Sequence, residues 1–307
     1  MIGPMRIVVA GGSGFLGAPL TAALRAAGHE AIVLTRRDRA LSPGTATWTP
    51  DGNAGPWASE VDGAEAVINL TGAALDEQRW TDARKRVLVE SRVLPTRSLA
   101  RAITAASRPP AVLLSASGVG YYGARGTEII TETDGAGSDF LAGLVSKWED
   151  EAMGAASAHT RVVVLRSGIV LAPDGGALAR MLVPFRFGAG GPFGSGRQYM
   201  AWIHRQDWIE LAVWLLTRPE ATGPLNAVAP TPVTNEEFAA TLAGVLRRPH
   251  LVRAPRFALR LVLGEMADAA LLTGRRVVPA KAQALGFRFK WTALEPALRA
   301  LLQKSPS

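Results

Sequence analysis

The chain has 307 residues, of which 48% are hydrophobic and 20% are charged, and it carries a net charge of +8 at pH 7. This composition is that of an ordinary globular protein, and the length allows one large domain or a large domain with a smaller lobe. The absence of cysteine excludes disulfides, thiolate zinc sites and cysteine nucleophiles, and it fits a reducing compartment.

Other functional classes are disfavoured by pattern. The positive charge lacks a run of five like charges or a basic stripe interleaved with aromatics, so we expect no nucleic-acid partner. The N-terminal residues show no signal-peptide core, and charged residues interrupt the apolar stretch near the C terminus. We therefore expect a cytoplasmic location without membrane binding.

Short apolar, β-branched runs alternate with helical patterns along the first half of the chain. Runs of this kind suit parallel strands buried on both faces, and they occur at residues 6–10, 30–34, 45–48, 65–70, 111–116 and 161–166. Helices are predicted over 15–27, 76–106 and 139–156, with a kink or break near Leu94 because Pro95 follows it. This order predicts an α/β fold with a doubly wound parallel sheet, Rossmann-like.

The pattern changes after residue 170. A glycine-rich loop at 188–198 precedes a short strand (199–204) and a helix (207–218), and "TNEE" at 234–237 predicts a capping box. No repeat or low-complexity linker separates these segments, so we expect a smaller C-terminal lobe packed on the sheet. We expect a dinucleotide-binding domain over 1–245, with substrate-lobe segments from about residue 171 onward, and a C-terminal domain over 246–307.

The stretch "GGSGFLG" follows the first strand and opens a helix, which is the context in which a glycine run binds a dinucleotide. Gly11 would allow the sharp turn, Gly14 the approach of a pyrophosphate, and Gly17 close packing of the helix on the sheet. The predicted phosphate cradle comprises Gly11, Ser13, Gly14, Phe15, Leu16 and Gly17.

The end of the second strand indicates which dinucleotide is bound. Thr35 and Arg36 stand where a dinucleotide-binding fold that takes NAD carries a carboxylate for the ribose hydroxyls. A guanidinium there can pair with a 2′-phosphate, so we favour NADP(H). Arg36 and Arg37 as solvated residues, or Asp38 serving NAD after a register shift, are the alternatives.

Several later stretches resemble one branch of the extended short-chain dehydrogenases/reductases, the "epimerase family" proteins with an extra C-terminal domain of unassigned role. The matching stretches are "VINLTGAAL" (67–75), "SASGVGYYG" (115–123), "VSKWEDEA" (145–152), "VVVLRSGIVLAPDGGAL" (162–178), "GGPFGSGRQYMAWIH" (190–204) and "GPLNAVAPTPVTNEEFA" (223–239). The resemblance implies further cofactor contacts at Leu70, Thr71, Gly72, Arg92 and Val170; for Arg92, a solvated helical arginine is the alternative.

Members of that group use a serine, and a tyrosine and a lysine spaced Y-x-x-x-K on the next helix. Here Ser117 follows the fifth strand, and Lys147 fits the lysine position, but Gly143 stands where the tyrosine belongs. Tyr122 is the predicted replacement, with Tyr121 or Asp134 as other acids; a packed aromatic with a surface hydroxyl is the alternative for Tyr122. Lys147 is expected to hold a ribose hydroxyl.

On the substrate side, Arg197 in the glycine-rich loop offers a guanidinium for an acidic group, with a solvated arginine as the alternative. His204 borders the expected substrate pocket, although "WIH…D" is also typical of a helix start near Asp207. The histidines show no metal-ligand spacing, so no metal is expected.

Two functions follow from these patterns. The first is an NADP(H)-dependent, epimerase-like oxidoreductase acting on a small polar substrate, with a nucleotide sugar as one candidate. The second is a noncatalytic NADP(H)-binding protein that senses cofactor state or supports a partner, which the missing tyrosine favours. A homodimer is one candidate assembly.

Overall fold

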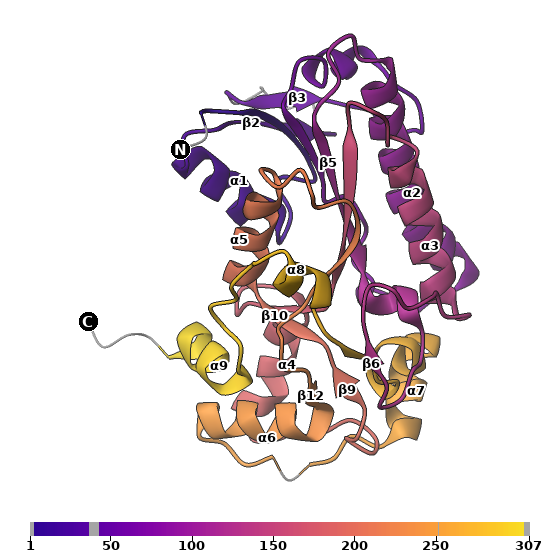
Figure 1. The fold of residues 1–307 in the computed structure, drawn as a ribbon. Helices are drawn as coiled ribbons and strands as arrows, with labels where there is room; N and C mark the ends of the chain where they lie inside the picture. Colours follow the sequence, from indigo (N-terminus) through magenta and orange to yellow (C-terminus); the bar gives the residue numbers. More distant parts are fainter. Residues whose placement is uncertain (1–2, 37–42, 251, 304–307) are drawn as a thin grey trace.

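The computed structural model describes residues 3–36, 43–250 and 252–303. A seven-stranded parallel sheet with the order β11-β7-β5-β4-β1-β2-β3 forms its centre (Figure 1). The strands are β1 (Arg6–Ala10), β2 (Glu30–Thr35), β3 (Thr45–Thr47), β4 (Ala66–Asn69), β5 (Val112–Gly118), β7 (Arg161–Ser167) and β11 (Gly223–Ala227). The order reverses between β1 and β4, which confirms the predicted doubly wound fold.

Helices cover both faces of this sheet, because the central strands are apolar and buried on both sides, as residues 7–10 of β1 and 66–68 of β4 show. One face packs on α1 (Gly17–Ala26) and α5 (Arg205–Leu215), and the other on α2 (Asp82–Ala105) and α3 (Phe140–Met153). Two short 3-10 helices, Pro56–Glu60 and Val119–Tyr122, lie in the connections.

Of the kink or break expected near Leu94, the break is wrong, since α2 runs through Pro95 as one helix, and the kink stays a prediction. A proline removes a single backbone donor, and the helix is packed on either side of it: the buried Leu88 lies in a cluster with residues of α3, and the buried Leu99 and Ile103 lie in a cluster with the sheet. Packing therefore outweighs the local cost.

The lobe stands at the carboxyl ends of the strands (Figure 1). Its apolar cluster joins α4, α6 and α9 around Trp202 and Phe238. The predicted capping box is present: the Thr234 hydroxyl accepts from the Glu237 amide, and the Glu237 carboxylate accepts from the Thr234 amide. The lobe elements are β8 (Ile169–Leu171), α4 (Gly176–Arg186), β9 (Tyr199–Met200), β10 (Trp202–His204), β12 (Val233–Thr234) and α6 (Asn235–Leu246).

The C-terminal segment is built into the rest of the protein. Ala282 and Phe287 belong to the cluster under the sheet, whereas Leu294 and Leu298 belong to the lobe cluster. The segment contains α7 (Arg256–Leu263), a π-helix (Ala267–Leu272), β13 (Arg276–Val277), α8 (Ala280–Ala284) and α9 (Leu294–Leu302), and β13 pairs with β6 (Ile129–Ile130).

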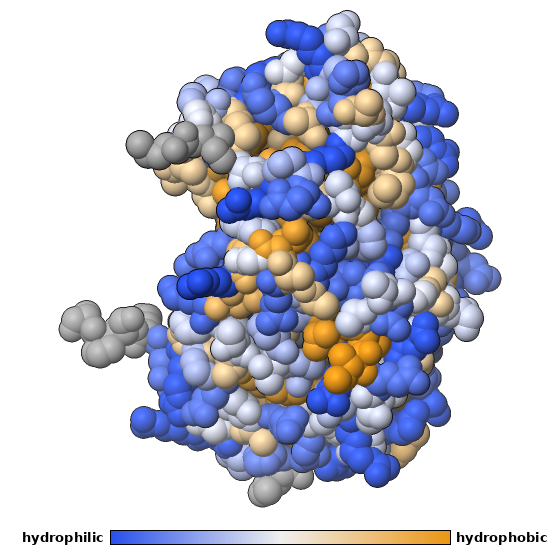
Figure 2. Space-filling model, in the orientation of Figure 1, coloured by the Kyte–Doolittle hydropathy of each residue, from blue (hydrophilic) through white to orange (hydrophobic). Residues whose placement is uncertain are grey.

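Figure 2 shows a largely hydrophilic face with an apolar patch in its lower right part, in the region of β6 in Figure 1. Ile129 of β6 is 58% exposed. No helix within the described ranges is long and apolar enough to cross a membrane.

Candidate functional site

The glycine loop between β1 and α1 has the geometry of a phosphate cradle. Gly11 adopts φ +79°, and a Cβ at Gly17 would lie 2.1 Å from the Gly11 carbonyl oxygen, so both positions require glycine. The backbone amides of Ser13, Phe15 and Leu16 find no acceptor among the described residues, and α1 begins directly after them. Unpaired amides at a helix N-terminus form an anion site.

The segment after β4 lies against this loop. A Cβ on Gly11 would come within 2.8 Å of the Leu70 carbonyl, and the Leu70 amide donates to Ala10 at 2.9 Å. The side-chain oxygen Oδ1 of the buried Asn69 accepts hydrogen bonds from the backbone amide and the hydroxyl of Thr71, at 3.1 and 2.6 Å. Asn69 therefore sets the exit path of the chain, which places Leu70 and Thr71 at the predicted crevice.

The carboxyl end of β2 carries Thr35, half-buried, and Arg36, exposed. Because β2 lies beside β1 in the sheet, this end adjoins the glycine loop. Arg37 and Asp38, including the alternative in which Asp38 serves NAD, lie outside the described residues. In the part that is described, the group offered at this edge is the guanidinium of Arg36.

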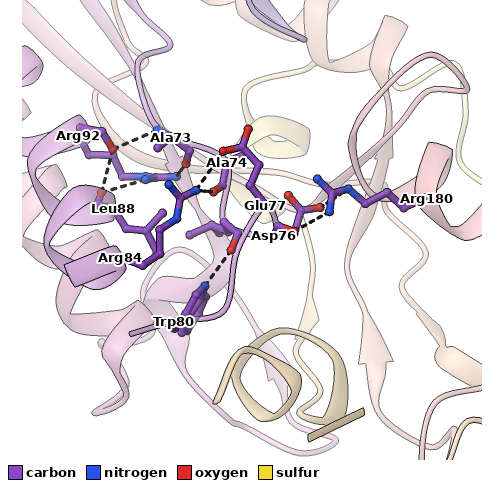
Figure 3. Close-up of polar contacts among 11 residues, drawn as sticks. Ala73, Ala74, Asp76, Glu77, Trp80, Arg84, Leu88, Arg92 and Arg180 are labelled. Atoms are coloured by element: carbon purple, nitrogen blue, oxygen red, sulfur yellow. Dashed lines mark hydrogen bonds and ion pairs between the residues drawn. The ribbon is translucent and has the colours of Figure 1, made fainter. Parts of the chain in front are cut away.

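Four long side chains hold the loop at residues 73–77 through hydrogen bonds and an ion pair (Figure 3). Arg92 donates to the Ala73 carbonyl and Arg84 to the Ala74 carbonyl, at 2.9 and 2.5 Å, while Trp80 donates to Leu75 at 2.8 Å. From the lobe, Arg180 pairs with the Asp76 carboxylate at 3.0 Å. The loop thereby ties the sheet to the lobe.

Arg92 is buried, which contradicts the alternative of a solvated helical arginine. Its guanidinium also donates to Leu88 and stacks 5.3 Å from the Trp148 ring, and burial lowers its pKa to about 10. Gly72 packs directly on it, since a Cβ there would lie 3.1 Å from the guanidinium carbon. Contact of Arg92 and Gly72 with a cofactor stays a prediction.

Phe15 joins the glycine loop to the loop that follows β8. A Cβ on Gly175 would lie 2.6 Å from the Phe15 ring, and one on Gly176 would lie 3.1 Å from it. Val170, the middle residue of β8, is buried in the cluster that Phe15 also packs against. Two of the predicted cofactor residues therefore meet through the tertiary structure.

Tyr122, the residue predicted to replace the catalytic tyrosine, is buried in the structure. The ring is 0% exposed, its hydroxyl donates to Asn226 at 2.7 Å, and Arg166 donates to that hydroxyl at 3.1 Å. Burial raises the pKa of Tyr122 to about 12. The ring is packed, as the alternative held, but its hydroxyl is enclosed and engaged rather than at the surface, which disfavours a catalytic role.

Ser117 and the adjacent strand β7 contribute to the same buried network. The Ser117 hydroxyl donates to Glu149 at 2.5 Å, and Arg166 binds the Glu149 carboxylate with two hydrogen bonds of 2.8 and 2.7 Å. The Arg166 guanidinium also stacks 3.4 Å from the Tyr121 ring. Ser117 thus has a structural partner at the end of β5.

Lys147 and Gly143, the residue that stands where the tyrosine belongs, share the exposed face of α3. Both residues are exposed, whereas Leu144 and Trp148, one position along, are buried, and Trp148 donates to Thr96 of α2 at 3.0 Å. Residues four apart share a helix face, so the inward pair is Leu144 and Trp148. Lys147 is therefore open to solvent, and its contact with a ribose hydroxyl of the cofactor stays a prediction.

The two predicted substrate residues differ in their surroundings. Arg197 is exposed, as its alternative required. His204 caps α5, accepting from the Gln206 amide at 3.0 Å, and its ring stacks 4.9 Å from Trp291. Burial, with nearby Lys290 and Arg205, lowers the pKa of His204 to about 4. The substrate role is corrected to a structural one, in agreement with the alternative that the sequence left open.

The family model described as "NAD dependent epimerase/dehydratase family" matches residues 7–228. The chain belongs to this family. A second model, described as a domain of unknown function (DUF1731), matches residues 254–301. The matches confirm the resemblance seen in the sequence, and the family model spans the glycine loop and the sheet from β1 to β11.

Members of the epimerase family resemble the chain along nearly its whole length. The epimerase family protein SDR39U1 of Homo sapiens is 38% identical over 301 residues, covering 97% of this chain and 100% of the relative. The epimerase family protein Mb2239 of Mycobacterium bovis is 40% identical over 294 residues, covering 95% and 96%.

Two solved structures of relatives share the fold. The crystal structure of the human epimerase family protein SDR39U1 with NADPH matches with a TM-score of 0.90 and 36% identity, covering 97% of this chain and 99% of that one. A nucleoside-diphosphate sugar epimerase from Corynebacterium glutamicum matches with a TM-score of 0.80 and 32% identity, covering 98% of this chain and 58% of that one.

In this epimerase-family fold, several site residues lack a sequence signal that would have revealed them. Glu149, Arg166 and Arg275 are charged residues whose partners lie on other elements, and Asn69 ends the apolar strand β4 inside the stretch "VINLTGAAL", which does not indicate its role. Trp148 was detectable in principle from the periodicity of α3, which places it on the apolar face with Leu144. Within the described residues no group of three or more His, Cys, Asp or Glu side chains is arranged to hold a metal ion.

Proposed function

We propose that the protein binds NADP(H) at the carboxyl edge of its parallel sheet. The observation that carries the proposal is the glycine loop, in which Gly17 packs on Gly11 and the amides of Ser13, Phe15 and Leu16 are left open to an anion. The crystal structure of the human relative with NADPH supports the same cofactor.

Arg36 supports the phosphorylated dinucleotide. It is exposed at the end of β2, beside the cradle, where a guanidinium can form charge-assisted hydrogen bonds with a 2′-phosphate. Loss of such a bond costs about 1.5–3 kcal/mol, which is roughly a 10- to 100-fold loss of affinity.

The test is a titration of the purified protein with NADPH and with NADH, followed by tryptophan fluorescence. We expect Arg36→Ala to weaken NADPH binding about 10- to 100-fold and to leave NADH binding nearly unchanged. Arg86→Ala, an exposed arginine on α2, is the matched control. Equal losses for the two nucleotides would contradict the role of Arg36, and no binding of either would contradict the cradle.

For the chemistry, the first candidate is an epimerase-like oxidoreductase acting on a small polar substrate, with a nucleotide sugar as one candidate. Membership of the epimerase family supports it. The second candidate is a noncatalytic NADP(H)-binding protein that senses cofactor state or supports a partner. The buried hydroxyl of Tyr122 favours the second, because an enclosed and hydrogen-bonded phenol is not placed to move a proton at a bound substrate.

The absorbance of the reduced nicotinamide separates these candidates. The holo-protein is incubated with nucleotide sugars and with other small polar metabolites, and NADPH oxidation is followed. Consumption that Gly17→Ala abolishes would establish the oxidoreductase. Because an epimerase returns the hydride and consumes no cofactor, the sugars are also analysed for epimer formation; stable NADPH together with unchanged substrates would support the noncatalytic candidate.

A further inference from the structure

A small cavity of about 60 Å³ lies where the lobe and the C-terminal segment meet the sheet. Val119, just after β5, and Ile169, the first residue of β8, form one wall. Gln198 and Asn235 come from the lobe, while Ala270 and Arg275 come from the π-helix and the residues after it. The cavity is therefore next to the strand ends that carry Ser117 and Val170.

Arg275 carries the positive charge of this cavity. The side chain is 7% exposed, and its Nη2 donates to the Ala269 carbonyl at 3.0 Å. The Asp139 carboxylate lies 3.7 Å away and also caps α3 by accepting from the Ala142 amide. The buried Nε of Arg275 finds no hydrogen-bond partner among the residues that the structure describes, and burial lowers the pKa of the guanidinium. An arginine so enclosed, with one long ion pair, is incompletely compensated.

The remaining polar walls are neutral and mostly engaged. Gln198 donates its side-chain amide to the carbonyls of Phe193 and Leu271, both at 2.9 Å. The Asn235 carbonyl accepts from the Phe193 amide, and no carboxylate is among the described residues that line the cavity. The electrostatics of the cavity therefore favour an anion.

The volume limits the size of that anion. A water needs roughly 10–15 Å³ of such space, so the cavity holds about four to six non-hydrogen atoms. One phosphate group or a short carboxylic acid fits, whereas a nucleoside diphosphate is too large to be enclosed.

We propose that this cavity binds one compact oxyanion, a phosphate group or a short carboxylate, on the guanidinium of Arg275. The role of this cavity as a substrate subsite rests on the proposed function, because the cavity adjoins the predicted NADP(H) crevice. Arg275 replaces Arg197, the exposed arginine that the sequence indicated, as the anion-binding residue. Ala270 is exposed and lines the cavity, so it lies at the mouth.

The test is isothermal titration calorimetry of the full chain, with and without saturating NADPH, at constant ionic strength set with sodium chloride. The probes are inorganic phosphate, lactate and UDP. We expect phosphate or lactate to bind, and the stronger of the two identifies the ligand class. Arg275→Met should weaken that binding at least about tenfold through loss of charge-assisted hydrogen bonds, while Arg197→Met should leave it unchanged.

Ala270→Leu provides a second variant that leaves the arginine in place and blocks the mouth, and it should also weaken binding. NADPH affinity and thermal unfolding are measured on every variant, so a failure of the cradle is seen separately. Failure of both phosphate and lactate to bind a protein that binds NADPH would overturn the proposal. UDP binding that both cavity variants abolish would contradict the size limit of the proposal, and equal losses in Arg275→Met and Arg197→Met would overturn it as well.

Discussion

The buried pair of Arg166 and Glu149 provides the sharpest test of how the carboxyl edge is held together. Their side chains are 4% and 10% exposed and share two hydrogen bonds of 2.8 and 2.7 Å. Arg166→Met leaves the Glu149 carboxylate in the interior with only the Ser117 hydroxyl as a donor. Stranding a buried charge costs about 3–5 kcal/mol, a large part of the total stability of a domain.

The same helix offers a matched control. Glu151 lies on α3, as Glu149 does, and it accepts two hydrogen bonds from Arg97 of α2. The side chains of Arg97 and Glu151 are 39% and 24% exposed. Water screens such a pair, so Arg97→Met should cost about 0–1 kcal/mol. The two variants remove the same group from the same type of pair and differ in burial.

Urea denaturation, with NADPH absent, measures the free energy of unfolding of each variant. The double variant Arg166→Met/Glu149→Leu should recover most of the loss, because it removes the stranded charge. Equal costs for Arg166→Met and Arg97→Met, or a double variant as unstable as Arg166→Met, would refute the reasoning that burial makes this pair decisive.

Three further predictions concern pH and the glycine loop. In the folded protein the pKa of His204 is lowered to about 4, so on acidification the unfolded chain takes up the proton first. The free energy of unfolding should therefore fall by about 3 kcal/mol between pH 6.5 and 4. The variant His204→Asn keeps a helix cap and should remove that dependence in urea denaturation measured against pH. In the folded protein the pKa of Tyr122 is raised to about 12, so at high pH the unfolded chain ionises first. The free energy of unfolding should therefore fall by roughly 2–3 kcal/mol between pH 10 and 12, and Tyr122→Phe should lack this part of the decrease. An identical decrease in both proteins would contradict the burial of the hydroxyl. Gly17→Ala places a Cβ 2.1 Å from the Gly11 carbonyl oxygen and should abolish NADPH binding in the fluorescence titration. Gly244→Ala, where a Cβ meets nothing within 4 Å, should retain it.

Local patterns in the sequence determined the parallel sheet, the glycine cradle and the capping box. Each depends on residues close together in the chain: the strand periodicity, the turn at Gly11, the contact of Gly17 with Gly11, and Thr234 with Glu237. Short-range geometry of this kind is the same in any tertiary context.

The tertiary structure decided what faces the crevice. Tyr122 meets Asn226 from 104 residues away, and this contact encloses its hydroxyl. On α3, the packing of the helix buries Trp148 and leaves the preceding residue, Lys147, exposed. Arg197 and Arg275 look alike in the sequence, and only the packing of the C-terminal segment buries one and exposes the other. Burial and charge partners arise from long-range contacts, which no local pattern encodes.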